Sequence, residues 1–140
     1  MSLFASPRFL PRVMAADAAS CAATGALQLA ATQPLAALTG LPTPLLVGTG
    51  IFLLAYALAA AGMARRQPAP RTLIGLVALG NLGWALGCVA LMLAGRLPLT
   101  GWGMAWLAAQ AVVVLVLADL QVAGLRATRR VGQGARQAVA

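Results

Sequence analysis

The chain has 140 residues, of which 61% are hydrophobic and only 9% are charged, and it carries a formal net charge of +8. Soluble domains hold roughly 45–50% apolar and 25% charged residues, so this composition excludes an ordinary water-soluble fold. All cations are arginines that lie mainly between or beyond the apolar stretches. This arrangement indicates membrane orientation rather than nucleic-acid binding.

Four apolar stretches are long enough to cross a bilayer core, which needs about 20 helical residues. In chain order they cover residues 13–38, 44–63, 72–94 and 102–124. The segments between them are short and contain Gly and Pro, so successive spans must run antiparallel. The sequence predicts an all-α membrane protein with one integral membrane domain over residues 1–140, folded as an up-and-down bundle of four transmembrane helices.

The arginines predict the direction of the chain in the membrane. One side receives Arg8, Arg12, Arg65, Arg66, Arg71, Arg126, Arg129, Arg130 and Arg136, and the other side receives only Arg96. Cytoplasmic loops carry the excess of positive charge, so both termini are expected to be cytoplasmic. The basic tail, residues 125–140, is interpreted as an anchor against anionic headgroups, with docking of RNA or a protein partner as the alternative.

The first span begins like a signal peptide, because two arginines precede an apolar stretch. Asp17, Ser20 and Thr24 interrupt that stretch, which favours a retained membrane helix over a cleaved leader. At 100° per residue, the polar side chains of this span fall on one narrow stripe that should face the bundle interior. The stripe contains Asp17, Ser20, Cys21, Thr24, Gln28 and Thr32.

The third span has two distinct faces. Asn81, Trp84 and Cys88 share one face through their i, i+3, i+7 spacing. A different face gathers the glycines of the sequence GNLGWALG, namely Gly80, Gly83 and Gly87. Small residues of this kind let another membrane helix approach closely, so the glycine face is predicted to be a helix-packing surface. A nucleotide-binding loop is excluded because no strand precedes the glycines.

Depth in the membrane, at 1.5 Å per residue, sorts the polar groups into layers. Asp17 and Asp119 lie near the cytoplasmic helix ends, where arginines can reach them. Asp17 is therefore either an arginine-paired structural group or a coupling group for protons or cations.

Deeper in the bundle, Thr24 and Asn81 share one level, and Gln28, Trp84 and Gln110 share the next. The predicted polar seam, or ion or ligand path, consists of Asp17, Thr24, Gln28, Asn81, Trp84 and Gln110. Whether this seam is filled by side chains or hydrated is left open.

The chain offers few groups for enzymatic chemistry. It contains no His, Glu or Lys, so most general bases, metal ligands and amine nucleophiles are missing. Cys21 and Cys88 form no metal motif and lie at different depths, which argues against a disulfide between them. We expect no catalytic residue, no metal site, no cofactor and no nucleic-acid partner.

Several short motifs add a resemblance. LPTPLLVGTG, GNLGW, AAQA and LADLQVAGLR occur in an order that resembles a group of short, uncharacterised bacterial four-helix inner-membrane proteins. The resemblance implies a bacterial cytoplasmic (inner) membrane location and no specific activity. It draws attention to Asp17, Asn81, Trp84, Gln110 and Gln121.

Two functional hypotheses follow. The first is a non-enzymatic membrane subunit that self-associates or serves a larger membrane complex, with the lipid bilayer as its environment and the glycine face as its docking surface. The alternative is a small transporter or channel, with its path lined by the first, third and fourth spans.

Overall fold

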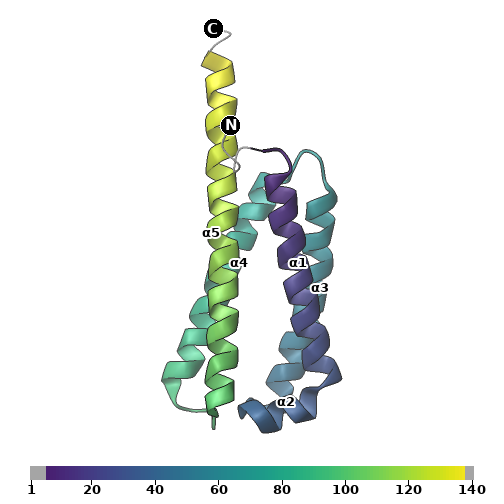
Figure 1. The fold of residues 1–140 in the computed structure, drawn as a ribbon, viewed down its shortest axis with the longest axis vertical. Coiled ribbons are helices and arrows are strands. Elements are labelled where there is room, and N and C mark those ends of the chain that lie inside the picture. The colour runs from purple at the N-terminus through teal and green to yellow at the C-terminus, as the bar shows by residue number, and fades with distance from the viewer. Residues whose placement is uncertain (1–5, 138–140) are drawn as a thin grey trace.

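The computed structural model describes residues 6–137, with side chains described as far as Arg129. Over this range the chain forms five helices and no strand (Figure 1). They are α1 (Phe9–Ala30), α2 (Thr32–Thr39), α3 (Thr43–Arg65), α4 (Arg71–Ala94) and α5 (Gly101–Gln137). Four of them are long and apolar enough to cross a membrane, which confirms the predicted all-α fold with four such helices. The molecule therefore fits a multi-pass membrane protein.

The first span is not one continuous helix, and the prediction of a single helix over 13–38 was wrong. The chain breaks at Ala31, where φ is −122° and ψ is 34°, and continues as the separate helix α2. Pro34 explains the break, because it has no N–H and its ring clashes with the carbonyl of the residue four positions earlier, Ala30. Figure 1 shows that α2 turns across the end of the bundle.

The end of α2 is fastened to the connection between α4 and α5. The Thr100 N–H donates to the Thr39 carbonyl at 3.1 Å, and the Thr100 hydroxyl donates to the Leu38 carbonyl at 2.6 Å. A Cβ on Gly103 would lie 2.0 Å from the Thr39 oxygen, so the two segments meet backbone to backbone. We name this end of the molecule the α2 end.

The membrane helices pack in two close pairs, α1 with α3 and α4 with α5, and α1 also contacts α5. In the first pair, a Cβ on Gly25 would lie 2.8 Å from the Gly50 oxygen, so only glycine allows this approach. α3 and α4 follow one another in the chain but do not pack closely. The short connections predicted that successive spans run antiparallel as neighbours, and this neighbour packing fails for α3 and α4.

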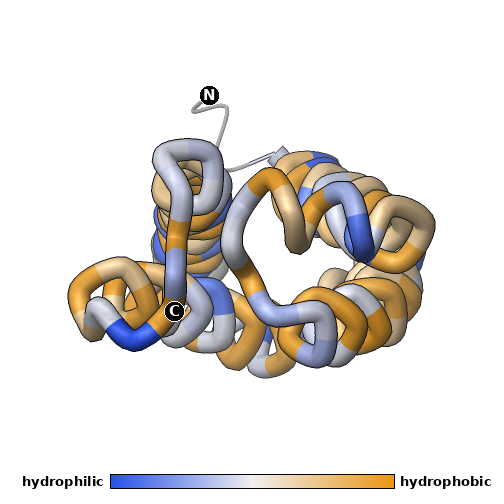
Figure 2. The backbone as a smooth tube through the Cα atoms, turned by 90° about the horizontal axis from the view of Figure 1, so that it is seen from below, coloured by the Kyte–Doolittle hydropathy of each residue, from blue (hydrophilic) through white to orange (hydrophobic). Residues whose placement is uncertain are grey.

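Burial follows the polarity of the helices in the way expected for a membrane protein. α1 is the least apolar of the four long helices and the most buried, whereas α3, α4 and α5 expose large apolar side chains. Leu58 and Leu93, for example, are 78% and 81% exposed. Figure 2 shows that hydrophobic residues recur along all of the long helices. The polar stripe of α1 is thus turned inward.

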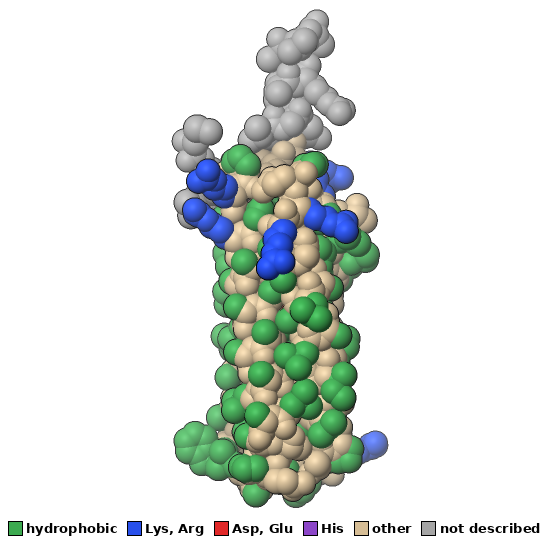
Figure 3. Space-filling view, turned by 90° about the vertical axis from the view of Figure 1, so that its right-hand side faces the viewer, with side chains coloured by type: hydrophobic (Ala, Val, Ile, Leu, Met, Phe, Trp, Pro, Cys, Tyr) green, Lys and Arg blue, Asp and Glu red, His purple; other side chains and the backbone are tan. Residues whose placement is uncertain are grey.

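Arginine side chains gather at the end of the molecule opposite α2, which we name the basic end (Figure 3). Arg96, between α4 and α5, lies at the α2 end. At the basic end α5 extends past the predicted span end at residue 124 and stays helical to Gln137. Its 37 residues correspond to about 55 Å, so it projects beyond the other helices.

Candidate functional site

The carboxylate of Asp17 is the meeting point of all four membrane helices. Asp17 is completely buried, with 0% of its surface exposed. Its Oδ2 accepts hydrogen bonds from the Tyr56 hydroxyl of α3 at 3.0 Å and the Asn81 amide of α4 at 3.0 Å. The Gln121 amide of α5 donates to the same oxygen at 2.7 Å. One side chain of α1 therefore links the other three long helices.

The neighbours of this carboxylate also bond to one another. The Asn81 amide donates to Gln121 Oε1 at 3.3 Å, and the Cys21 thiol lies 3.6 Å from Asp17 Oδ1. We name these five residues, Asp17, Cys21, Tyr56, Asn81 and Gln121, the Asp17 hub. Every neighbour donates toward Asp17, and an ionised carboxylate is an acceptor only, so the donor set suits the charged form. Burying that group without such donors would be very costly.

Of the two alternatives for Asp17, the arginine-paired one is wrong, because the side-chain hydrogen bonds of Asp17 all come from neutral side chains of the hub. Arg12 is only five residues away, but five residues turn a helix by about 140°, so the two side chains leave α1 in different directions. Asp119 is exposed on α5 and does not join Asp17. An acid pair between these two carboxylates is therefore ruled out.

Nearer the α2 end, a second set of polar contacts joins α4 to α5. The Trp84 indole N–H donates to Gln110 Oε1 at 3.3 Å, which agrees with the predicted common depth of these residues. The ring of Phe52 stacks on Trp84 with centroids 5.8 Å apart and 8° between the planes. This stack is a bridge from α3 to α4, which are otherwise not closely packed.

The other predicted seam residues have different partners from those expected. Gln28 shares the depth of Trp84 but bonds to α3, where the Thr49 hydroxyl donates to its Oε1 at 3.1 Å. Thr24 was predicted to lie at the same depth as Asn81 and to belong to the same seam. In the structure Thr24 is half-buried on a cavity wall, whereas the Asn81 amide donates to the residues of the hub. The structure therefore brings Asp17 together with Asn81, and Trp84 with Gln110, as two separate contacts.

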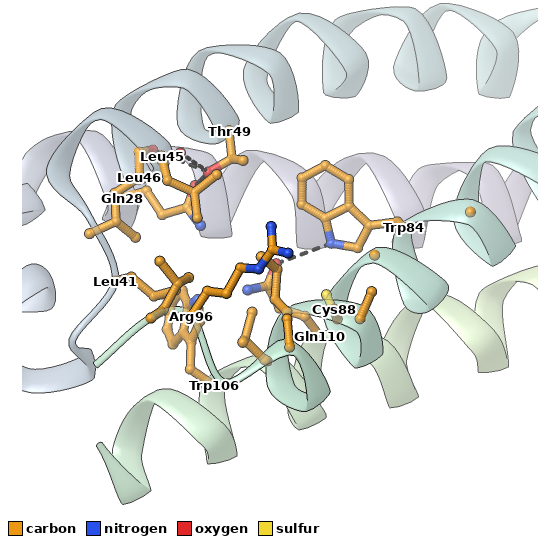
Figure 4. Close-up of a pocket in the computed structure, with 17 residues that line it drawn as sticks. Gln28, Leu41, Leu45, Leu46, Thr49, Trp84, Cys88, Arg96, Trp106 and Gln110 are labelled. Atoms are coloured by element: carbon orange, nitrogen blue, oxygen red, sulfur yellow. Dashed lines mark hydrogen bonds between the residues drawn. The ribbon is translucent and has the colours of Figure 1, made fainter. Parts of the chain in front are cut away.

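Two cavities lie among the helices: the larger mainly between α3, α4 and the start of α5, and the smaller among all four long helices. The larger, about 900 Å³, lies toward the α2 end and includes Gln28, Trp84, Arg96, Trp106 and Gln110 in its walls (Figure 4). The smaller, about 380 Å³, reaches from there to the hub. The seam is thus filled by side chains at the Asp17 hub and open toward the α2 end.

The glycine face of α4 forms one edge of this open space. Gly80, Gly83 and Gly87 are exposed, and a Cβ on any of them would meet no atom within 4 Å. Gly83 and Gly87 line the larger cavity, and Gly80 lines the smaller one. No other described helix uses the close approach that these glycines permit.

Sequence reasoning missed several residues of the site. Neither Tyr56 nor Thr49 was predicted from the sequence to belong to the site. The signal for Tyr56 was present, since a phenol in an apolar membrane helix needs a hydrogen-bond partner. Arg96 was used only to orient the chain, because its position beside a cavity depends on how α2 and the α4–α5 connection pack.

The described residues offer no metal site, because no group of three His, Cys, Asp or Glu side chains lies together among them. Cys21 and Cys88 are both buried and free, as expected from their different depths. No family model, curated protein or solved structure matches the chain. The functional argument therefore rests on the geometry of the hub, the glycine face and the cavities.

Proposed function

We propose that this protein is a non-enzymatic subunit of a membrane assembly, formed with further copies of itself or with a larger complex, and that the glycine face of α4 receives the partner helix. Its compartment in this proposal is the bacterial inner membrane, with both termini cytoplasmic. The arginine asymmetry and the resemblance described above support that placement.

The observation that carries the proposal is a contrast between two groups of glycines. Gly25, Gly50 and Gly103 are used inside the chain, where added Cβ atoms would meet a neighbour at 3.3 Å or less. The three glycines of the α4 face have the same close-packing capacity but no partner within 4 Å. Helix association in a bilayer depends on such close packing, because lipid is as apolar as the helices themselves.

Substitution of a single glycine tests this proposal. Gly83→Leu fills the α4 face and should abolish the assembly, which native mass spectrometry or cross-linking in mild detergent detects. Gly62→Leu is the matched control, because Gly62 is also an exposed helical glycine with nothing within 4 Å, but it lies on α3. A wild-type chain that purifies alone as a monomer, or an assembly that survives Gly83→Leu, contradicts the proposal.

A second candidate function, a small transporter or channel, is favoured by the two cavities. Their walls carry Thr24, Gln28, Asn81 and Gln110, which are polar groups suited to a solute path. The Asp17 hub then closes the path at the basic end, and opening requires its hydrogen bonds to exchange. In proteoliposomes, Asp17→Asn should abolish a pH-dependent flux; flux that is intact in this variant removes the coupling role of Asp17.

A further inference from the structure

Arg96 is a cation whose counter-charge does not come from this chain. The chain has only two acidic residues, Asp17 and Asp119. Asp17 is enclosed in the hub, and Asp119 lies 18 residues along α5 from Gly101, or about 27 Å from the α2 end. Among the described residues, no carboxylate therefore accompanies Arg96 at the α2 end.

Arg96 is an exposed residue that lines the larger cavity. Figure 4 shows its side chain over the cavity, on the side of Trp84 and Gln110. Trp106 also lines this cavity, and its indole nitrogen is buried without a hydrogen-bond partner among the described residues.

The rest of the cavity is mainly apolar, with Gln28, Thr49 and Gln110 as its other polar residues. Its volume of about 900 Å³ is in the range of small-molecule pockets. Six leucines contribute to its walls: Leu41, Leu45, Leu46, Leu91, Leu97 and Leu107. Trp102, 68% exposed at the start of α5, is the kind of residue that lies at the headgroup level, so Arg96 is at that depth as well.

From these observations we infer that the larger cavity binds a membrane lipid with an anionic headgroup. The headgroup pairs with Arg96, and an acyl chain lies along the leucines that line the cavity. The headgroup lies beyond the proposed partner-helix surface, because Arg96 is past the end of α4, about 10 Å or more from Gly87. The acyl chain enters the part of the cavity that Gly83 and Gly87 line.

Quenching of tryptophan by brominated lipid tests this inference. The protein carries Trp102→Phe, so that only the two cavity tryptophans, Trp84 and Trp106, report. It is placed in lipid vesicles of phosphatidylcholine with increasing fractions of chain-brominated phosphatidylglycerol, and in parallel with chain-brominated phosphatidylcholine. Brominated phosphatidylglycerol should quench the tryptophan fluorescence at a lower lipid fraction than brominated phosphatidylcholine does. The quenching should also reach a plateau, because the lipid fills a single cavity.

Two arginine variants locate the headgroup. Arg96→Gln should reduce the preference for phosphatidylglycerol by about fivefold, the factor expected for one cation near an anionic lipid. Arg66→Gln, an exposed arginine at the basic end, should leave the preference unchanged. Arg96 is exposed in a connection, so its replacement should not unfold the protein, and the unfolding midpoint checks this.

Three results would overturn the inference. The first is equal quenching by the two brominated lipids in the protein that retains Arg96. The second is a preference for phosphatidylglycerol that survives Arg96→Gln. The third is an Arg66→Gln variant that loses this preference as much as Arg96→Gln does. Native mass spectrometry of the same samples records the oligomer separately, so loss of lipid preference and loss of assembly are distinguishable. An assembly that retains no lipid and shows no quenching would assign the cavity to a partner helix instead.

Discussion

At the scale of single residues, one buried carboxylate organises the polar interior of the bundle. Three side chains from three other helices donate to the same oxygen of Asp17. The sequence predicted that Asp17 and Asn81 face inward, because helical spacing alone fixes which side chains share a face. It did not predict that they meet, because contact also depends on how far α1 and α4 slide and rotate against each other.

The first prediction concerns the loss of that carboxylate. Asp17→Ala leaves the donors of Tyr56, Asn81 and Gln121 buried without their acceptor, so the free energy of unfolding should fall by about 2–4 kcal/mol. Unfolding by denaturing detergent in mixed micelles, followed by circular dichroism, measures it. Asp119→Ala is the control and should change little, because Asp119 is exposed.

Tyr56 provides a milder test of the same contact. Tyr56→Phe removes only the hydroxyl that donates to Asp17 and keeps the ring that stacks near Phe52. The free energy of unfolding should fall by about 0.5–2 kcal/mol, the usual contribution of a hydrogen bond between membrane helices. If this variant unfolds at the wild-type detergent fraction, the Tyr56 hydroxyl does not contribute to stability.

At the scale of helices, proline determines where a helix is interrupted, and glycine determines where two helices come into close contact. Pro34 was visible in the sequence, yet the apolar run to residue 38 favoured one long helix over a helix and a short turn-back. The close pair of α1 and α3 depends on Gly25 and Gly50 lying at the same height. That coincidence follows from the length of α2 and its connection, which hydrophobic periodicity does not determine.

The α1–α3 contact leads to a third prediction. Gly25→Ala places a Cβ 2.8 Å from a backbone oxygen of α3, so the two helices must separate. The free energy of unfolding should fall by about 1–3 kcal/mol, as for other overpacked interiors. Gly62→Ala, where the added Cβ meets nothing within 4 Å, should leave the detergent unfolding midpoint at or above that of the wild type. Equal effects of the two substitutions would contradict the close packing of α1 on α3.

At the scale of the whole molecule, charge and polarity are arranged from end to end. The basic end carries most arginines and the filled hub, and the α2 end carries Arg96 and the open cavity. Composition and span length were sufficient to predict four membrane helices, since the thickness of the bilayer core sets the length of any apolar helix that crosses it. The cavity was not predictable, because it results from the poor packing of α3 against α4.

The arginine asymmetry leads to a prediction about topology. A green fluorescent protein fused after residue 140 should fluoresce in bacterial cells, and alkaline phosphatase fused at the same position should be inactive, because the proposed topology places the basic end in the cytoplasm. The same pair of reporters inserted next to Arg96 should give the reverse result. Active phosphatase at the C-terminus would show that the bundle is inverted.

The most direct test of the fold and its hub is a double-mutant cycle between Asp17 and Gln121, which are 104 residues apart in sequence. We predict that the free-energy losses of Asp17→Ala and Gln121→Ala, measured by detergent unfolding, are not additive, with a coupling of about 0.5–2 kcal/mol. Gln110→Ala combined with Asp17→Ala is the control and should be additive, because Gln110 bonds to Trp84 instead. Additive losses for Asp17 and Gln121 would contradict the hub.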